Sequence, residues 1–452
     1  MVILHASSEV YPLSRSGGLA DVLGVLPAAQ RQVGADQVFT VSPWYGSLQG
    51  QPELLGEFGS AGEVFRLGRV ELAGVIHLLI GGRMFEGADL YGYRDDVWRF
   101  VQFDLAVIAA LQVAGLRPDV VHAHDWATGL LPALLRYGPE ANRLGSAKLV
   151  YTIHNLNYQG RWNLEEVRSW SGLPAELFGP DGLEFYGDAN LMKAGIRWAD
   201  LVTTVSPTYA REITTPERGE GLDGMLRQVR DAGRLVGILN GLDQQRWDPA
   251  HDPYASFQSL TERAQRSAEL RAALRLDRRP ILSMVTRIAE QKGIDLVLAA
   301  AERLSERWNL VLLGSGDPGM EAQLSELARS GLLTYRSGID EALAHRIYAG
   351  SDAFLMPSHF EPCGLSQMIA QRYGCLPVVR RTGGLIDTVS PDIGFLFDRP
   401  EPEALLAATD RAADLLGSRD WKRRVRAAMR LDWSWEGPAR AYLERYAALR
   451  PS

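Results

Sequence analysis

Two series of short apolar segments limit the folds open to this chain more than any other feature. The first series consists of strand-like runs separated by helical stretches, at 2–4, 38–41, 75–80, 119–124, 149–154 and 201–205. The second has the same character and lies at 280–285, 310–314, 353–357 and 377–379. Continuously apolar strands that alternate with helices are typical of parallel sheets buried on both faces. The sequence therefore predicts an α/β protein with two doubly wound parallel sheets.

The pattern breaks after 236–241, where a polar stretch rich in Gln, Asp and Pro begins. A length of 452 residues exceeds the usual size of one domain. We therefore place a domain boundary near Gly241. Ligands of such sheets bind beyond the carboxyl ends of the strands, so functional residues are expected there.

The composition argues against several classes of protein. A formal charge of −7 is unlike that of a nucleic-acid binder, which usually shows a basic face. Cys363 and Cys375 are too few for a disulfide framework and are interpreted as reduced thiols. Neither an apolar run of about 18 residues nor a secretory signal is evident, so we expect a cytoplasmic protein without a membrane span.

Paired glycines occur at two similar places, one in each half of the chain. Segments 16–21 and 382–387 read Ser-Gly-Gly-Leu-Ala-Asp and Thr-Gly-Gly-Leu-Ile-Asp, each between a loop and an apolar helical stretch. Glycines let a backbone approach a ligand, and a helix N-terminus offers free N–H groups. Any helix can open with glycines. Two such loops nevertheless favour two nucleotide-fold domains facing one cleft, with an anionic, sugar-bearing ligand between them.

Polar residues follow two neighbouring strands of the first series. Asp125 comes directly after the strand at 119–124, and His154 with Asn155 closes the strand at 149–154. A lone histidine at a strand end is more often a packing or capping residue than a catalytic one. The convergence of two strands on one sheet edge favours a functional role for both groups.

Charged residues also follow strands of the second series. Arg287 and Lys292, five positions apart at a strand–helix junction, suit a diphosphate, although a solvated pair at a helix start is an equal alternative. Glu361 lies between Phe360 and Pro362, which is unusual for a solvated glutamate, and an ion pair in a structural turn stays possible.

Metal and nucleotide-triphosphate motifs do not stand out. The eight histidines and two cysteines show no zinc-ligand spacing, and no Asp-x-Asp pair or P-loop lysine motif is recognised. We expect neither a metal nor another cofactor, and stabilisation of a leaving group by Arg and Lys instead.

A series of motifs covers nearly the whole chain, at 5–9, 17–22, 122–126, 154–160, 190–195, 205–213, 239–241, 361–365, 381–385 and 433–435. In sequence and in order these motifs resemble one family, the bacterial glycogen synthases of the starch-synthase type that use ADP-glucose. The resemblance implies the GT-B arrangement of two Rossmann-like domains, at 1–241 on the acceptor side and 242–432 for the nucleotide sugar. It also implies a C-terminal helix at 433–452 that packs back on the first domain.

The resemblance implies a retaining glucosyltransferase that adds glucose from ADP-glucose to the non-reducing end of an α-1,4-glucan such as glycogen. Catalytic roles fall on His154, Arg287, Lys292, Glu361 and Asp125, with Arg287 and Lys292 neutralising the departing diphosphate. Substrate contacts are expected from Arg15, Gly17, Gly18, Asp21, Asn155, Asn240, Cys363, Gly364, Leu365, Thr382, Gly383 and Gly384. Nucleic-acid and membrane partners are not expected, and the oligomeric state stays open.

Two positions depart from the family's pattern. Arg15 stands where relatives usually carry lysine, and its planar guanidinium cannot copy a point-charge ammonium. Ile339 stands where relatives often carry an aromatic residue that stacks on the base. Two alternatives follow: a related enzyme with another donor or acceptor, such as a sucrose-type synthase or an α-glucan phosphorylase, and a non-catalytic glucan-binding protein.

Overall fold

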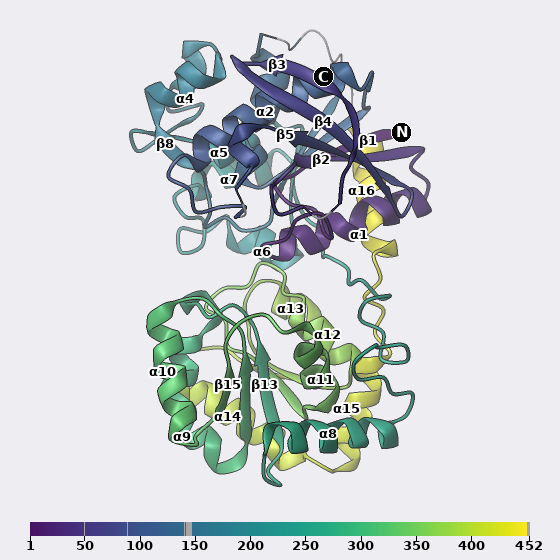
Figure 1. Cartoon of the computed structure of the whole chain (residues 1–452). Helices are drawn as coiled ribbons and strands as arrows, with labels where there is room; N and C mark the ends of the chain where they lie inside the picture. Colours follow the sequence, from purple (N-terminus) through teal and green to yellow (C-terminus); the bar gives the residue numbers. More distant parts are fainter. Residues whose placement is uncertain (49, 88, 140, 142–146, 450–452) are drawn as a thin grey trace. The chain divides into compact units, whose positions relative to one another are not determined.

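Two parallel α/β sheets organise the chain, each in a unit of its own (Figure 1). The computed structural model describes residues 1–48, 50–87, 89–139, 141 and 147–449. The first unit comprises Met1–Gly241 and Trp435–Ser452, and the second comprises Leu242–Ser434. Each unit is described by itself below.

The sheet of the first unit has nine strands in the order β12-β11-β7-β6-β1-β2-β5-β4-β3. The seven strands from β12 to β5 pair in parallel. Their bounds are β1 Val2–Ala6, β2 Gln37–Pro43, β5 Val75–Gly81, β6 Val120–His124, β7 Lys148–Ile153, β11 Leu201–Thr204 and β12 Leu235–Gly237. Six of these strands coincide with the six apolar runs of the first series, which confirms that prediction.

An antiparallel hairpin at one edge corrects the prediction of a wholly parallel sheet. Strands β3 (Glu53–Ser60) and β4 (Glu63–Leu72) pair antiparallel, and β4 pairs antiparallel with β5. Ala61 and Gly62, with φ of 48° and 82°, form the tight turn that joins them. Strand β3 has no buried residue, because the edge strand of a mixed sheet can leave its side chains, here including Leu54 and Leu55, in water.

Helices surround this sheet. They are α1 (Gly18–Gln32), α2 (Asp96–Val113), α3 (Leu131–Tyr137), α4 (Leu164–Ser171), α5 (Leu191–Trp198), α6 (Pro207–Glu212), α7 (Asp223–Asp231) and α16 (Glu436–Ala448). A small sheet of β8 (Arg161–Asn163), β10 (Asp188–Asn190) and β9 (Glu184–Phe185) lies beside them.

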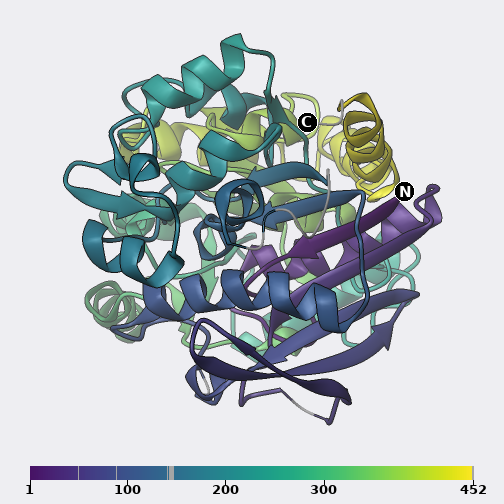
Figure 2. The ribbon, with the colours of Figure 1, turned by 90° about the horizontal axis from the view of Figure 1, so that it is seen from above.

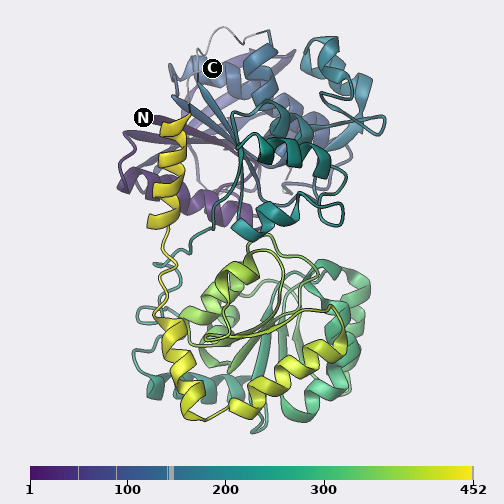
Figure 3. The ribbon, with the colours of Figure 1, turned by 180° about the vertical axis from the view of Figure 1, so that it is seen from behind.

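The helix α16 is separated in sequence from the rest of the first unit. It packs beside α1 and the N-terminal strand, as the yellow helix near the N-terminus in Figures 2 and 3 shows. Tyr442 and Tyr446 are buried in one apolar cluster with Ile3, Val120 and Val150. The last helix of the chain therefore completes the core built by its first strand.

The sheet of the second unit has six parallel strands in the order β15-β14-β13-β16-β17-β18. Their bounds are β13 Ile281–Val285, β14 Asn309–Leu313, β15 Thr334–Arg336, β16 Ala353–Met356, β17 Leu376–Arg380 and β18 Phe395–Phe397. Helices cover both faces: α8 (Leu260–Leu274), α9 (Ile294–Arg307), α10 (Pro318–Arg329), α11 (Glu341–Gly350), α12 (Ser366–Arg372), α13 (Gly384–Thr388), α14 (Pro402–Leu415) and α15 (Arg419–Met429). Leu282 and Met284 of β13 enter one apolar core while Ile281 enters the other, as the two-residue period of a strand requires. All four apolar runs of the second series are strands, as predicted.

Candidate active-site residues

Asp125 and His154 lie together at the carboxyl ends of β6 and β7. The Asp125 carboxylate accepts hydrogen bonds from the backbone N–H of His154 at 2.7 Å and of Asn155 at 3.3 Å. The Asp125 N–H donates to the carbonyl of Thr152 at 2.9 Å. Asp125 thus connects the ends of the two strands by hydrogen bonds. Its own backbone has a φ of 55°, in the left-handed region.

Burial sets the protonation of these groups. Loss of solvation raises the pKa of Asp125 to about 7, although the two backbone hydrogen bonds favour its charged form. Burial lowers the pKa of His154 to about 3, so its imidazole is neutral at pH 7. A neutral imidazole can face a developing positive charge without repelling it.

The first glycine loop is held by a glutamate that the sequence analysis gave no role. One carboxylate oxygen of Glu9 accepts the N–H groups of Ser16 at 2.5 Å and Gly17 at 3.1 Å. Burial raises the pKa of Glu9 despite these bonds. Arg15 is exposed and pairs with Asp21 at 3.2 Å. The Glu9 carboxylate therefore occupies two of the amides that could have bound a phosphate, and the Arg15 guanidinium already has an anionic partner.

Lys292 and Glu361, predicted with separate roles, form an ion pair in the second unit. Lys292 Nζ lies 2.6 Å from Glu361 Oε2, and the Ser358 hydroxyl donates to the same oxygen at 3.2 Å. The Glu361 side chain is only 6% exposed. Arg287 is exposed after β13, and its guanidinium donates to Gln291 Oε1 at 3.3 Å.

The second glycine loop packs directly against the backbone of the Glu361 loop. Gly384 N–H donates to the Glu361 carbonyl at 3.0 Å, and a Cβ at Gly384 would lie 2.3 Å from the Cys363 carbonyl oxygen. Gly383 has φ 45° and Gly364 has φ 75°, both in the left-handed region that favours glycine. The structure therefore brings residues 361–364 and 382–384 together in one unit.

The remaining predicted residues lie near these loops or at strand ends. Asn240 is buried in the segment after β12. Thr382 and Cys363 are buried, and Leu365 lies at the start of α12. Burial raises the pKa of the Cys375 thiol, in keeping with its predicted place in the core. Ile339 is 93% exposed just before α11.

A pocket of about 460 Å³ opens in the first unit, and Trp126, the residue that follows Asp125, is part of its lining. It mixes aromatic rings with amide side chains, which suits a ligand with both apolar faces and hydroxyls. Its lining includes Tyr93, Trp126, Tyr158, Trp162, Asn157 and Gln159.

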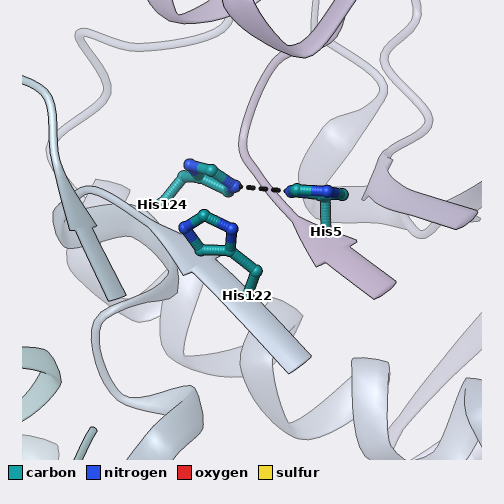
Figure 4. A group of neighbouring side chains, drawn as sticks. All are labelled: His5, His122 and His124. Atoms are coloured by element: carbon teal, nitrogen blue, oxygen red, sulfur yellow. Dashed lines mark hydrogen bonds between the residues drawn. The ribbon is translucent and has the colours of Figure 1, made fainter. Parts of the chain in front are cut away.

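Three buried histidines form a cluster that the sequence analysis missed. His5, His122 and His124 hold ring nitrogens within 4.8 Å of one another, close enough to share a metal ion (Figure 4). The two-residue spacing of His122 and His124 on one strand was a signal that both face the same side. Only the pairing of β1 with β6, which sets His5 opposite His122, completes the group.

No helix among the described residues combines the length and the apolar character that a bilayer crossing requires.

Comparison with known proteins defines the class of the chain. Residues 2–228 match the family model of the starch synthase catalytic domain, and residues 266–426 match that of the group 1 glycosyl transferases. The catalytic domain of starch synthase IV from Arabidopsis thaliana, solved with ADP and acarbose bound, is similar with a TM-score of 0.90 and 32% identity over 98% of each chain. Sucrose-phosphate synthase from Thermosynechococcus elongatus, at 21% identity and a TM-score of 0.65 over 99% of this chain and 98% of that one, shares the fold. The chain is a glycosyltransferase of the GT-B fold.

A curated relative places it more narrowly. The glycogen synthase of Deinococcus radiodurans is 51% identical over 452 residues, which cover 99% of this chain and 100% of the relative. This chain belongs to the glycogen synthase family, and its activity is that of a glucosyltransferase. The predicted family, GT-B fold and glucosyl transfer are thereby confirmed.

Proposed function

We propose that the chain transfers glucose from ADP-glucose, with retention of configuration, to the non-reducing end of an α-1,4-glucan such as glycogen and releases ADP. The proposal is supported chiefly by the arrangement in the second unit, where Lys292, Glu361 and the Gly383-Gly384 loop adjoin one another. It gains weight from the ADP and acarbose bound by the plant relative.

Arg287 and Lys292 bind the diphosphate in this proposal. The bond between the anomeric carbon and the diphosphate oxygen breaks, so negative charge grows on the leaving oxygen. Arg287 is exposed and able to form two parallel hydrogen bonds to a phosphate. Lys292, in its ion pair, adds a nearby cation whose position is fixed before the donor binds.

Glu361 binds glucosyl hydroxyls and does not attack the sugar. A retaining hydrolase uses one carboxylate as a nucleophile and a second one about 5 Å away. The Glu361 carboxylate instead holds Lys292 and Ser358, which lowers its nucleophilicity. We therefore propose attack on the same face of the sugar, with a phosphate oxygen of the donor taking the proton of the acceptor hydroxyl.

His154 contacts the glucosyl unit as a neutral imidazole, and Asp125 orients a sugar hydroxyl while it fixes the strand end that carries His154. Asn155, Asn240, Asp21 and the 363–365 loop provide further sugar contacts. The aromatic pocket lined by Trp126 and Tyr158 receives glucose units of the acceptor. Ile339 covers the base of the donor with its exposed aliphatic side chain.

The test is incorporation of labelled glucose into glycogen by the purified protein, with ADP-glucose and UDP-glucose compared in the presence of EDTA. We expect transfer from ADP-glucose. Preference for UDP-glucose would overturn the donor assignment, and glucan binding without transfer from either donor would favour a binding protein.

A pair of matched variants tests the role of Arg287. Arg287→Met removes a guanidinium from the proposed diphosphate site and is expected to lower kcat/KM about 100-fold. Arg303→Met removes an exposed guanidinium from α9, 65% exposed, and is expected to leave kcat/KM unchanged. Equal rates for the two variants would contradict the assignment.

A further inference from the structure

A line of hydrogen bonds runs through the first unit from α1 to His154. Gln30 Oε1 lies 2.7 Å from His5 Nε2, and His5 Nδ1 lies 3.0 Å from His124 Nε2. His124 Nδ1 then lies 3.0 Å from His154 Nε2. The contact between His5 and His124 is the dashed line in Figure 4. Three imidazoles from neighbouring strand ends thus connect a helix to the proposed sugar-contacting residue.

The hydrogen bonds favour this line over a metal site at His5, His122 and His124. Both ring nitrogens of His5 and His124 take part in the line itself. The nitrogens of His122 contact the Tyr446 hydroxyl at 2.6 Å and the Thr152 hydroxyl at 2.5 Å. A metal ion would have to replace hydrogen bonds at all three rings, and unpaired buried groups are costly.

The three rings of the line are neutral. Burial lowers the pKa of His5 to about 4 and that of His154 to about 3. It also lowers the pKa of His124 well below its usual value, and the neighbouring histidines add to this effect. A neutral imidazole carries one N–H and one acceptor nitrogen.

The orientation of the Gln30 amide therefore determines which nitrogen of His154 carries the proton. The Gln30 carbonyl oxygen can only accept, so His5 donates from Nε2 and its Nδ1 accepts from His124 Nε2. His124 Nδ1 in turn accepts from His154 Nε2. This leaves Nδ1 of His154 as its unprotonated nitrogen. If the Gln30 amide were reversed, every proton in the line would move to the other nitrogen of its ring.

Tyr446 of α16 is the second partner of the Gln30 amide. Gln30 Nε2 donates to the Tyr446 hydroxyl at 3.3 Å, while Gln30 Oε1 lies on the side of His5. The Tyr446 hydroxyl also forms a hydrogen bond of 2.6 Å with His122 Nδ1. Gln30 and Tyr446 are both buried, so water does not compete for these bonds.

We propose that Gln30 and Tyr446 are positioning residues that fix the tautomer of His154 through His5 and His124, so that His154 presents Nδ1 as an acceptor to a hydroxyl of the glucosyl unit. The contact with sugar rests on the proposed function; the tautomer does not. Catalysis then depends on a helix of the core that does not itself touch the substrate.

The test is the ¹⁵N spectrum of protein labelled at histidine, without substrate, with the His154 signals assigned by their loss in His154→Gln. We expect a protonated Nε2 and an unprotonated Nδ1. In Gln30→Met the signals should move toward a protonated Nδ1 or a mixture of tautomers, and kcat should fall about tenfold with little change in KM. Tyr446→Phe should move them in the same direction, and it serves if Gln30→Met does not fold.

Thr40→Val is the matched control. It removes a buried hydroxyl that bonds His77 Nδ1 at 2.7 Å in the same sheet, so the tautomer of His77 should change and that of His154 should not. A protonated Nδ1 on His154 in the parent protein, or a His154 tautomer unchanged in the variants, would overturn the proposal. The expected tautomer in a protein that transfers no glucose would overturn the proposed function instead.

Discussion

At Gly384 a Cβ atom would meet the Cys363 carbonyl oxygen at 2.3 Å, whereas at Gly17 and Gly18 it would meet no heavy atom of the described residues within 4 Å. The two glycine loops look alike in the sequence. In the second unit the backbone packing itself requires glycine. In the first unit the space beside the glycines is open, and only a ligand that approaches the loop would require them.

The polar groups beside the two loops differ in the same way. The second unit buries an ion pair, Lys292 with Glu361, against its glycines. The first unit holds its loop with the buried Glu9 carboxylate, which accepts two backbone N–H groups, and leaves its Arg15–Asp21 pair partly exposed. The similar sequences of the two loops therefore do not indicate which forces hold each loop in place.

The largest expected difference between the two units is in how their stability changes as the pH falls. Five histidines of the first unit have pKa values lowered by burial, so only the unfolded chain binds their protons between pH 6.5 and about 4: His5, His77, His122, His124 and His154. His5, His77 and His154, whose pKa values are lowered to between about 3 and about 4, each cost about 2 kcal/mol of stability at pH 5. Asp125, Asp104 and Glu9, whose pKa values are raised, gain stability as pH falls and offset part of this loss. We expect a net loss of stability in the first unit as the pH falls from 7 to 5.

Hydrogen exchange at pH 7 and pH 5, corrected for the intrinsic rate, measures this loss unit by unit. The strands β1, β6 and β7 should lose protection while β13, β14 and β16 keep theirs. Equal loss in both sheets would show that the buried histidines do not set the acid sensitivity.

Gly384→Ala tests the steric half of the comparison. The added methyl group forces the Cys363 backbone to move, and we expect a loss of about 3 kcal/mol in the unfolding free energy of the second unit. Gly18→Ala should change stability by less than about 1 kcal/mol, since it adds helix propensity at an open position. Its activity should nevertheless fall if a ligand approaches there. Urea unfolding measures the effect of each substitution on stability, and donor kinetics measure the effect on activity. An unchanged unfolding free energy in Gly384→Ala would contradict the steric role of this glycine.

Lys292→Met tests the electrostatic half. It leaves the Glu361 carboxylate buried without its cation and should cost about 3 kcal/mol. Arg15→Met breaks a partly exposed pair and should cost less than about 1 kcal/mol. The double variant Lys292→Met with Glu361→Gln should regain most of the stability without regaining activity. Unchanged thermal unfolding of Lys292→Met would mean that the pair contributes nothing.

Arg15→Lys should have the smallest effect. Lysine keeps the charge beside Asp21, so we expect donor KM to stay within about threefold or to improve. A collapse in donor affinity would show that the bond between the Arg15 guanidinium and Asp21 shapes the first loop. Steady-state kinetics with ADP-glucose decide between these outcomes.

The sequence predicted the parallel strands better than it predicted contacts between them. Continuous apolar runs such as 149–154 identify buried strands without any partner. The hairpin of β3 and β4 was missed because an edge pair that stays half in water lacks such runs. The ion pair of Lys292 and Glu361 joins residues 69 positions apart. The line of hydrogen bonds from Gln30 to His154 depends on strand pairing and on α16. Neither local pattern nor spacing carries that information.

The position of α16 has a consequence for biosynthesis. Because Tyr446 closes the core around β1, a ribosome must translate all of Leu242–Ser434 before the first unit can finish folding. The second unit, continuous in sequence, can form its own sheet in the meantime. The half of the enzyme that is made first is thus the half that matures last, and a nascent chain arrested before α16 would expose the apolar faces of α1 and β1 to chaperones.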